Sequence, residues 1–371
     1  MKNKNDLVYW ILFAHLPRWT TLKTNKLIVR IIHNQQITFE EFFNLSHDEW
    51  IETYKLEYKE INDLEQARKE LPNYSFLLED MLSQGYELIP FNSSDYPKTL
   101  KDNLKLKFAP PLIYTKGNKS LLNDATIAIV GSRKAGETSL EFTKNIATNA
   151  TNKYQCVVSG GAKGIDQTAL DESIKANGHS ILVLPQGILT FSSGMKKYYK
   201  HIVDGNLLIL STFFPKAGWS TGLAMGRNKY IYGLSKEIYV AESDSKGGTW
   251  SGVLEGLKSE RTIYIRNPKD DEKNANDLLI LKGGKAVDMN GIPLESNQTD
   301  EISLDEKIKS TIKGIALTAK QIKEKINYDI DTRKFSLYLS GLPFVKKEKK
   351  GSSNVFIYKN ESTQLSLFDT N

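Results

Sequence analysis

The feature that most constrains the fold is a regular alternation between apolar and amphipathic segments from residue 126 to residue 266. Six short apolar runs end in glycine or polar loops, and helical spacing follows the first five: TIAIVG, QCVVSG, SILVLPQG, NLLILS, EIYVAES and TIYIR. Continuous apolar strands that alternate with helices are typical of a parallel sheet covered on both faces. We therefore predict an α/β fold with a Rossmann-like, doubly wound, mainly parallel sheet, in which ligands bind outside the carboxyl ends of the strands.

The segments on either side of this region differ in pattern. Residues 1–85 place apolar side chains at spacings of three and four, with Thr38 and Ser46 as expected N-caps, which predicts helices. Residues 86–118 contain prolines and turn residues between short apolar runs, so we expect strands and loops there. We predict a helical N-terminal domain (1–85), an extended Rossmann-like domain (86–290), a linker (291–302), a winged-helix domain (303–360) and a flexible tail (361–371).

The winged-helix prediction rests on three short helical patterns followed by two strand-like runs, PFVKKE and NVFIYKN. Residues 303–360 contain 13 Lys and Arg against 6 Asp and Glu. The net charge of this segment, +7, is therefore larger than the +6 of the whole chain. The basic surface suits either nucleic acid or a protein partner.

Composition excludes several classes of protein. The single cysteine, Cys156, lies in an apolar run, so we expect a core residue and neither an internal disulfide nor a cysteine-built metal site. The apolar run at residues 7–16 is too short to span a bilayer and lacks a cleavage site. We expect a cytoplasmic protein that contacts no membrane.

Two glycine-rich loops follow the first two apolar runs and carry the residues that we expect to bind phosphate. They are Gly131, Ser132, Arg133 and Lys134 in the first loop, and Ser159, Gly160, Gly161, Lys163 and Gly164 in the second. Such loops place backbone N–H groups and cations at a helix start, where a phosphate fits. Asp166 is expected to cap the second helix. Neither loop is a P-loop or a dinucleotide fingerprint, and we expect no cofactor and no metal.

The motifs GSR, SGGAKGID and GRNKYIYGLS, preceded by DYPKTL and PPLIYTKGN, resemble in this order those of the DprA (Smf) family of DNA-processing proteins. The resemblance spans almost the whole chain. It implies a non-catalytic protein that binds single-stranded DNA on its Rossmann-like domain, forms a homodimer and loads a RecA-type recombinase during DNA uptake. It further implies phosphate contacts by Arg133, Lys163, Arg227 and Lys229, with Asn228 shaping the same loop.

Three departures from the family pattern indicate a divergent branch. Lys229 stands where relatives often carry a second arginine, which keeps the charge but loses the planar fork. Leu170 replaces a histidine, and residues 245–256 read SKGGTWSGVLEG in place of the family's serine-glycine-leucine-threonine-alanine loop.

The loop at residues 245–256 also supports an enzymatic alternative. It resembles the PGGxGTxxE loop of lysine-decarboxylase-like phosphoribohydrolases, which cleave nucleoside monophosphates with a glutamate and an arginine. Glu255 and Arg227 would then act on a ribosyl bond, although Trp250 and Ser251 interrupt the spacing and Glu255 can simply pack a helix. A nucleotide-sensing module without DNA binding would use the same loops.

Aromatic residues and the chain end add two hypotheses. Trp219 and Trp250 are expected at the binding edge, where bases could stack on them, or where they could line a pocket or a dimer edge. The sequence QLSLF resembles the peptide by which bacterial replication and repair proteins dock on the sliding clamp. Its motif residues are Gln364, Leu365, Leu367 and Phe368. A terminus that is disordered or folds back on the core is the alternative.

Overall fold

The computed structural model describes residues 4–269, 272–294, 304–326, 328, 330–351 and 353–359. Its centre is a nine-stranded sheet with the strand order β1-β2-β6-β5-β4-β3-β7-β8-β9. The strands are β1 (Glu87–Pro90), β2 (Leu112–Gly117), β3 (Thr126–Gly131), β4 (Cys156–Ser159), β5 (Ser180–Val183), β6 (Leu207–Ser211), β7 (Glu237–Glu242), β8 (Ile263–Arg266) and β9 (Lys285–Val287). Strands β3 to β9 pair in parallel, and only the pairs β1–β2 and β2–β6 are antiparallel. The predicted doubly wound, mainly parallel sheet is confirmed.

The direction of strand addition reverses at β3. The chain first adds β4, β5 and β6 on one side of β3 and then crosses back to place β7 on its other side. In open α/β sheets this reversal leaves a crevice at the carboxyl ends of the two strands, because their outgoing loops turn toward opposite faces. The loops that follow β3 and β7 therefore define where a ligand should bind.

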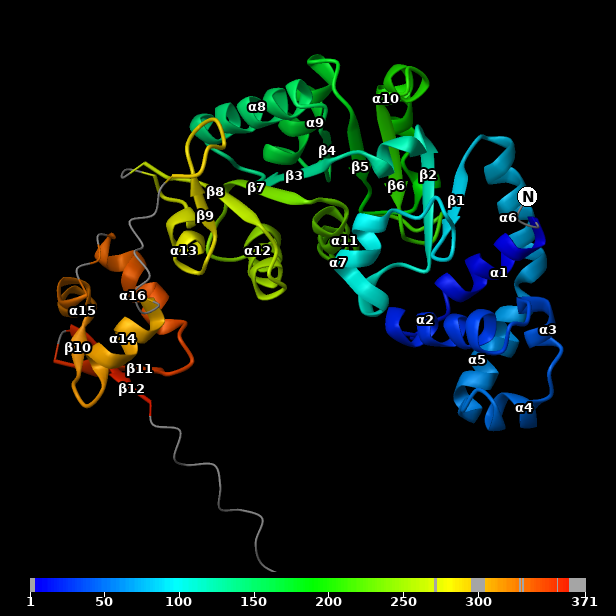
Figure 1. Cartoon of the computed structure of the whole chain (residues 1–371), viewed down its shortest axis with the longest axis horizontal. Coiled ribbons are helices and arrows are strands. Elements are labelled where there is room, and N and C mark those ends of the chain that lie inside the picture. Colours follow the sequence, from blue (N-terminus) through cyan, green and yellow to red (C-terminus); the bar gives the residue numbers. More distant parts are fainter. Residues whose placement is uncertain are drawn as a thin grey trace, which may run out of the picture.

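Helices cover both faces of the sheet, and successive strand residues pack into different cores (Figure 1). On β3, Ile127 and Ile129 pack on one face, while Ala128 and Val130 pack on the other. One face carries α8 (Glu137–Asn152), α9 (Ile165–Lys175) and α10 (Ser192–Val203); the other carries α7 (Lys98–Phe108), α11 (Thr221–Leu234), α12 (Gly248–Lys258) and α13 (Asn276–Leu281). Cys156 is a free, buried core residue, as predicted.

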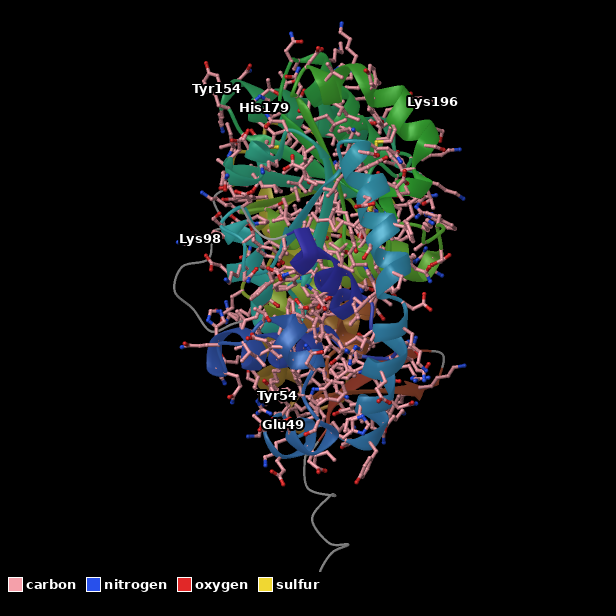
Figure 2. All side chains as sticks on the ribbon, turned by 90° about the vertical axis from the view of Figure 1, so that its right-hand side faces the viewer. Glu49, Tyr54, Lys98, Tyr154, His179 and Lys196 are labelled. Carbon is pink, nitrogen blue, oxygen red and sulfur yellow. The ribbon has the colours of Figure 1, made fainter. Side chains whose placement is uncertain are left out.

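The amino ends of the strands lie at the opposite edge from the glycine-rich loops. Tyr154 and His179 come just before β4 and β5, and Figure 2 shows both near the top of the molecule. Glu49 and Tyr54, from the N-terminal helices, lie near the bottom of the same view. Charged residues at the amino ends can therefore serve as controls for experiments on the carboxyl-end loops.

Residues 4–83 are helical, as the sequence predicts. They form α1 (Lys4–Ala14), α2 (Thr21–Val29), a π-helical segment η1 (Arg30–Asn34), α3 (Phe39–Phe43), α4 (His47–Glu52), α5 (Tyr58–Lys69) and α6 (Leu71–Ser83). Thr38 and Ser46 cap α3 and α4 through reciprocal bonds with Glu41 and Glu49, which confirms both predicted N-caps. The core of these helices continues into the sheet, where it includes Tyr114. The division at residue 85 into a separate domain stays a prediction.

His15 lies at this junction between the N-terminal helices and the sheet. Its Nε2 lies 2.8 Å from the Tyr114 hydroxyl, and the Phe214 ring meets its edge. Burial lowers the pKa of His15 to about 4, below the 6.5 of a free histidine.

Acidification should therefore destabilise the fold through His15. Because the unfolded chain binds the proton more tightly, the contribution of neutral His15 is complete above pH 6.5 and is lost as the pH falls toward 4. We expect a loss on the order of 1–2 kcal/mol by pH 5, measured as the urea unfolding free energy of the wild type minus that of His15→Gln. The same pH dependence in both proteins would contradict this assignment.

Two elements differ from the sequence-based expectation. Residues 86–118 hold the helix α7 as well as strands and loops, because Pro97 precedes it and Leu100 and Leu104 share one helical face. The helical path is interrupted at Lys105, whose φ is 51°. The strand series also continues beyond residue 266, since β9 adds a parallel strand beside β8.

The C-terminal part packs against α13. It contains α14 (Leu304–Ile312), β10 (Leu317–Thr318), α15 (Ala319–Lys325), α16 (Thr332–Ser340), β11 (Val345–Lys350) and β12 (Ser353–Tyr358), with the sheet order β10-β12-β11. Leu278 of α13 belongs to its hydrophobic core, and the Lys334 Nζ lies 2.9 Å from the Asp277 carboxylate. The winged-helix class of this part stays a prediction. None of the described helices is long and apolar enough to cross a membrane.

Candidate nucleic-acid interface

A cleft of about 480 Å³ opens at the carboxyl ends of β3 and β7, where the strand order reverses. We name it the switch-point cleft. Its lining comes from four segments: the loop Gly131–Lys134, the start of α9, one face of α11 and the loop after β7. Among the predicted site residues it brings together Gly131, Ser132, Arg133, Lys134, Arg227 and Asn228.

The helix start behind the first loop is already occupied by a carboxylate of the chain. Glu242, at the end of β7, accepts a hydrogen bond from the Gly136 N–H at 3.0 Å and one from the Ser139 hydroxyl at 2.7 Å. The free N–H groups that we expected there for a phosphate are therefore partly used. The loop instead offers the side chains of Arg133 and Lys134, which are both exposed.

Arg227 lies beneath the cleft and is only 3% exposed. Its Nη1 donates to the Val183 carbonyl at 2.9 Å, and its Nη2 lies 3.9 Å from the Asp166 carboxylate. Burial lowers the pKa of Arg227 and raises that of Asp166, and the attraction between their charges opposes both shifts. The Nε–H of Arg227 is buried and lacks a hydrogen-bond partner within the described residues. Arg227 thus supplies a positive charge from below rather than an exposed fork.

The second loop, residues 159–164, contributes little to the lining of the cleft. It mainly packs against Arg227 and against the first loop. An added methyl group at Gly160 would fall 1.6 Å from Nη1 of Arg227, so the guanidinium packs directly on this backbone. Gly164 has a φ of +82° and faces the Ser132 carbonyl, 2.5 Å from where a side chain would begin. Ser159 is fully buried and donates to the Asp166 carbonyl, so it does not reach a ligand.

Three predictions about the second loop need correction or remain open. Asp166 does not cap α9, because Gly164 is the N-cap and the Asp166 carboxylate is buried beside Arg227. Lys163 and Gly161 are exposed, but neither lines the switch-point cleft. Contacts of Lys163 with phosphate therefore stay a prediction.

Sequence reasoning missed three charged residues of the site, Glu242, Asp244 and Lys246, and the exposed Asp244 places a carboxylate among the cations of the cleft wall. Lys246, in the loop after β7, is exposed and lines the cleft together with Arg133 and Lys134. The sequence did contain a pattern that could have identified Lys246, because a lysine beside two glycines at a helix start also occurs in the first two loops. Glu242 had no comparable signal, because its partners Gly136 and Ser139 lie more than 100 residues away in the sequence.

The two predicted stacking residues occupy different environments. Trp219 is 55% exposed, in the loop before α11, and is free to meet a base. Trp250, on α12, packs against the core of the sheet and that of the C-terminal part. Its position favours the packing alternative.

Glu255 and Arg227 do not share a cleft. Glu255 lines a second, smaller hollow between α7, α11 and α12, together with Lys229, whereas Arg227 lines the switch-point cleft. This separation gives no support to a paired action on one ribosyl bond. Among the described residues there is no group of three His, Cys, Asp or Glu side chains that could hold a metal ion.

The model of the family "DNA recombination-mediator protein A" matches residues 87–292, which are 206 of the 371 residues. The chain belongs to this family. The matched region holds every strand of the large sheet and the whole switch-point cleft. The resemblance to DprA (Smf) proteins is confirmed at the level of the family.

Known proteins of this family are moderately similar in sequence. DNA processing protein DprA of Bacillus subtilis is 27% identical over 237 residues, which cover 61% of this chain and 75% of the relative. DprA of Streptococcus pneumoniae is 27% identical over 211 residues, covering 56% and 73%. The X-ray structure of the S. pneumoniae protein aligns with a TM-score of 0.56 at 22% identity, over 77% of this chain and 95% of that chain. The structural likeness concerns the fold.

Proposed function

We propose that this protein binds single-stranded DNA through its phosphate backbone in the switch-point cleft and acts in DNA processing without catalysing a reaction. The observation that carries the proposal is the set of exposed cations on the cleft wall, Arg133, Lys134 and Lys246, above the buried charge of Arg227. Membership in a family of recombination mediators supports DNA as the polyanion.

Phosphate contacts of this kind determine how binding should behave. Each cation that neutralises a phosphate releases a condensed counterion, so affinity falls as salt rises. Backbone contacts carry no base-pair code, so binding should depend only weakly on sequence. A cleft with cations from three segments can hold successive phosphates of a flexible single strand, which a stiff duplex cannot bend to follow.

Fluorescence anisotropy of labelled oligonucleotides over a salt series tests the proposal. We expect single strands to bind more tightly than duplexes of the same length. The plot of log K against log salt should have a slope of about −0.7 for each phosphate that is neutralised. Binding that does not change with salt would refute the phosphate model, and equal binding of both forms would refute the preference for single strands.

The partners implied by the family resemblance belong to the same proposal. We propose a homodimer, recombinase loading, a cytoplasmic location and clamp docking through Gln364, Leu365, Leu367 and Phe368, which lie outside the described residues. Analytical sedimentation tests whether the protein is a dimer, and co-purification tests whether it binds the recombinase. If the sliding clamp is still pulled down after Leu367 and Phe368 are both changed to alanine, the clamp-docking hypothesis is wrong.

A further inference from the structure

A second cleft of about 280 Å³ lies directly beside the switch-point cleft, between α7, α11 and α12. We name it the lateral cleft. Phe108, at the end of α7, is 37% exposed in its wall, although most residues of this size are buried. Polar groups on the opposite side include the exposed Glu255. A small hollow with one aromatic wall and a few polar groups is typical of a site for a small, flat ligand.

The two clefts share one wall. Met225, Asn228 and Tyr232 line both of them, and their spacing of three and four residues places them on one face of α11. Gly248, at the start of α12, completes the wall, because its backbone lies against the Asn228 and Met225 side chains. A ligand can therefore pass from one cleft to the other over a single helix face.

The hydroxyl of Tyr232 lies in this wall without a partner. It is buried and makes no hydrogen bond within the described part of the chain. The hydroxyl packs against Gly252 of α12, 3.1 Å from where a side chain would begin there. Burial raises the pKa of Tyr232, and the charges of Asp166 and Glu255 raise it further. A buried hydroxyl without a partner costs free energy that a bound ligand could recover.

We propose that the lateral cleft receives one nucleobase of the strand whose phosphates occupy the switch-point cleft. The base would stack on Phe108, receive or donate a hydrogen bond at the Tyr232 hydroxyl, and present its amino group to the Glu255 carboxylate. The Nζ of Lys107 lies 4.9 Å and that of Lys229 lies 5.7 Å from the centroid of the Phe108 ring. This inference rests on the proposed function, because the base belongs to the same strand whose phosphates occupy the switch-point cleft on the other side of the shared wall.

An abasic oligonucleotide separates base contacts from phosphate contacts, because it keeps the backbone charge and lacks the bases. We expect the wild type to bind the normal strand about 5- to 100-fold more tightly than the abasic strand, as base stacking on one or two aromatic rings predicts. Phe108→Ala should remove most of this difference and leave the salt slope unchanged. Tyr232→Phe should reduce it about two- to tenfold without lowering the urea midpoint, since the hydroxyl has no partner in the free protein.

Two control variants make the outcomes distinct. Phe76→Ala removes a 73% exposed aromatic from the N-terminal helices and should change nothing. Trp219→Ala tests stacking at the rim: if it abolishes the preference for bases while Phe108→Ala does not, the lateral cleft is not the base site. Equal binding of normal and abasic strands by the wild type would also overturn the inference. No binding of either strand would instead overturn the proposed function, and the base site with it.

Discussion

Replacing Arg133 and Lys246 by alanine should weaken the binding of single-stranded DNA by about a hundredfold or more. Both side chains are exposed on the wall of the switch-point cleft, and they come from loops that follow the adjacent strands β3 and β7. A hydrogen bond to a charged group contributes about 1.5–3 kcal/mol, so the loss of two such contacts amounts to at least about two decades in affinity. Anisotropy at constant salt measures the loss.

The salt dependence gives a second, independent readout of the same variant. Two fewer neutralised phosphates should flatten the slope of log K against log salt by about 1.4. The matched control changes Lys153 and Lys236 to alanine. These exposed lysines lie just before β4 and β7, at the amino-end edge of the sheet, and the net charge falls by the same amount. An equal loss in the control would mean that the overall charge of the protein, and not the cleft, attracts DNA.

Replacing Arg266 by methionine should lower the free energy of unfolding by about 3–5 kcal/mol, the usual effect of breaking a buried ion pair. Arg266 is 1% exposed at the end of β8 and forms an ion pair with Glu272. It also donates to the Ser139 hydroxyl at 2.9 Å and to the Ala241 carbonyl at 3.0 Å. The substitution removes the Arg266 donor from the Glu272 carboxylate, the Ser139 hydroxyl and the Ala241 carbonyl, and urea unfolding measures the result.

A double variant distinguishes the ion pair from simple packing. Changing Glu272 to methionine in addition removes the carboxylate that lost its partner, so we expect part of the stability to return. If the double variant loses as much as the sum of the two single changes, the interaction between Arg266 and Glu272 contributes little. Because Ser139 joins Arg266 to Glu242, the single variant should also disturb the first loop, and its DNA affinity reports on that link.

The architecture was predictable because it depends on local patterns. Apolar runs ending at Gly131 and Ser159 specify buried parallel strands, and the side-chain requirements of an N-cap identify Thr38 and Ser46. The helix α7 was missed because prolines and turn residues surround it, although Leu100 and Leu104 carry the helical spacing. Phe108, and with it the lateral cleft, was missed for the same reason.

The candidate site was predictable only in its outline. The glycine loops place Arg133 and Lys134 at the sheet edge, and the fold rule for such sheets says that this edge binds ligands. The sequence pattern does not show how deeply each side chain is buried. Arg227 becomes buried because Gly160 leaves room for its guanidinium, a contact between residues 67 positions apart. Long-range contacts of this kind decide which cations face a ligand and which support the loops.

The reversal of strand order at β3 also has a consequence for how the chain is made. One edge of β3 pairs with β4 soon after both are synthesised, but its other edge waits for β7, which begins 106 residues after Gly131. At ordinary rates of translation this interval lasts roughly 5–20 s. An apolar strand with an unpaired edge is a template for pairing with other chains. A cell that produces this protein must therefore shield the strand at the switch-point cleft until its last neighbour has left the ribosome.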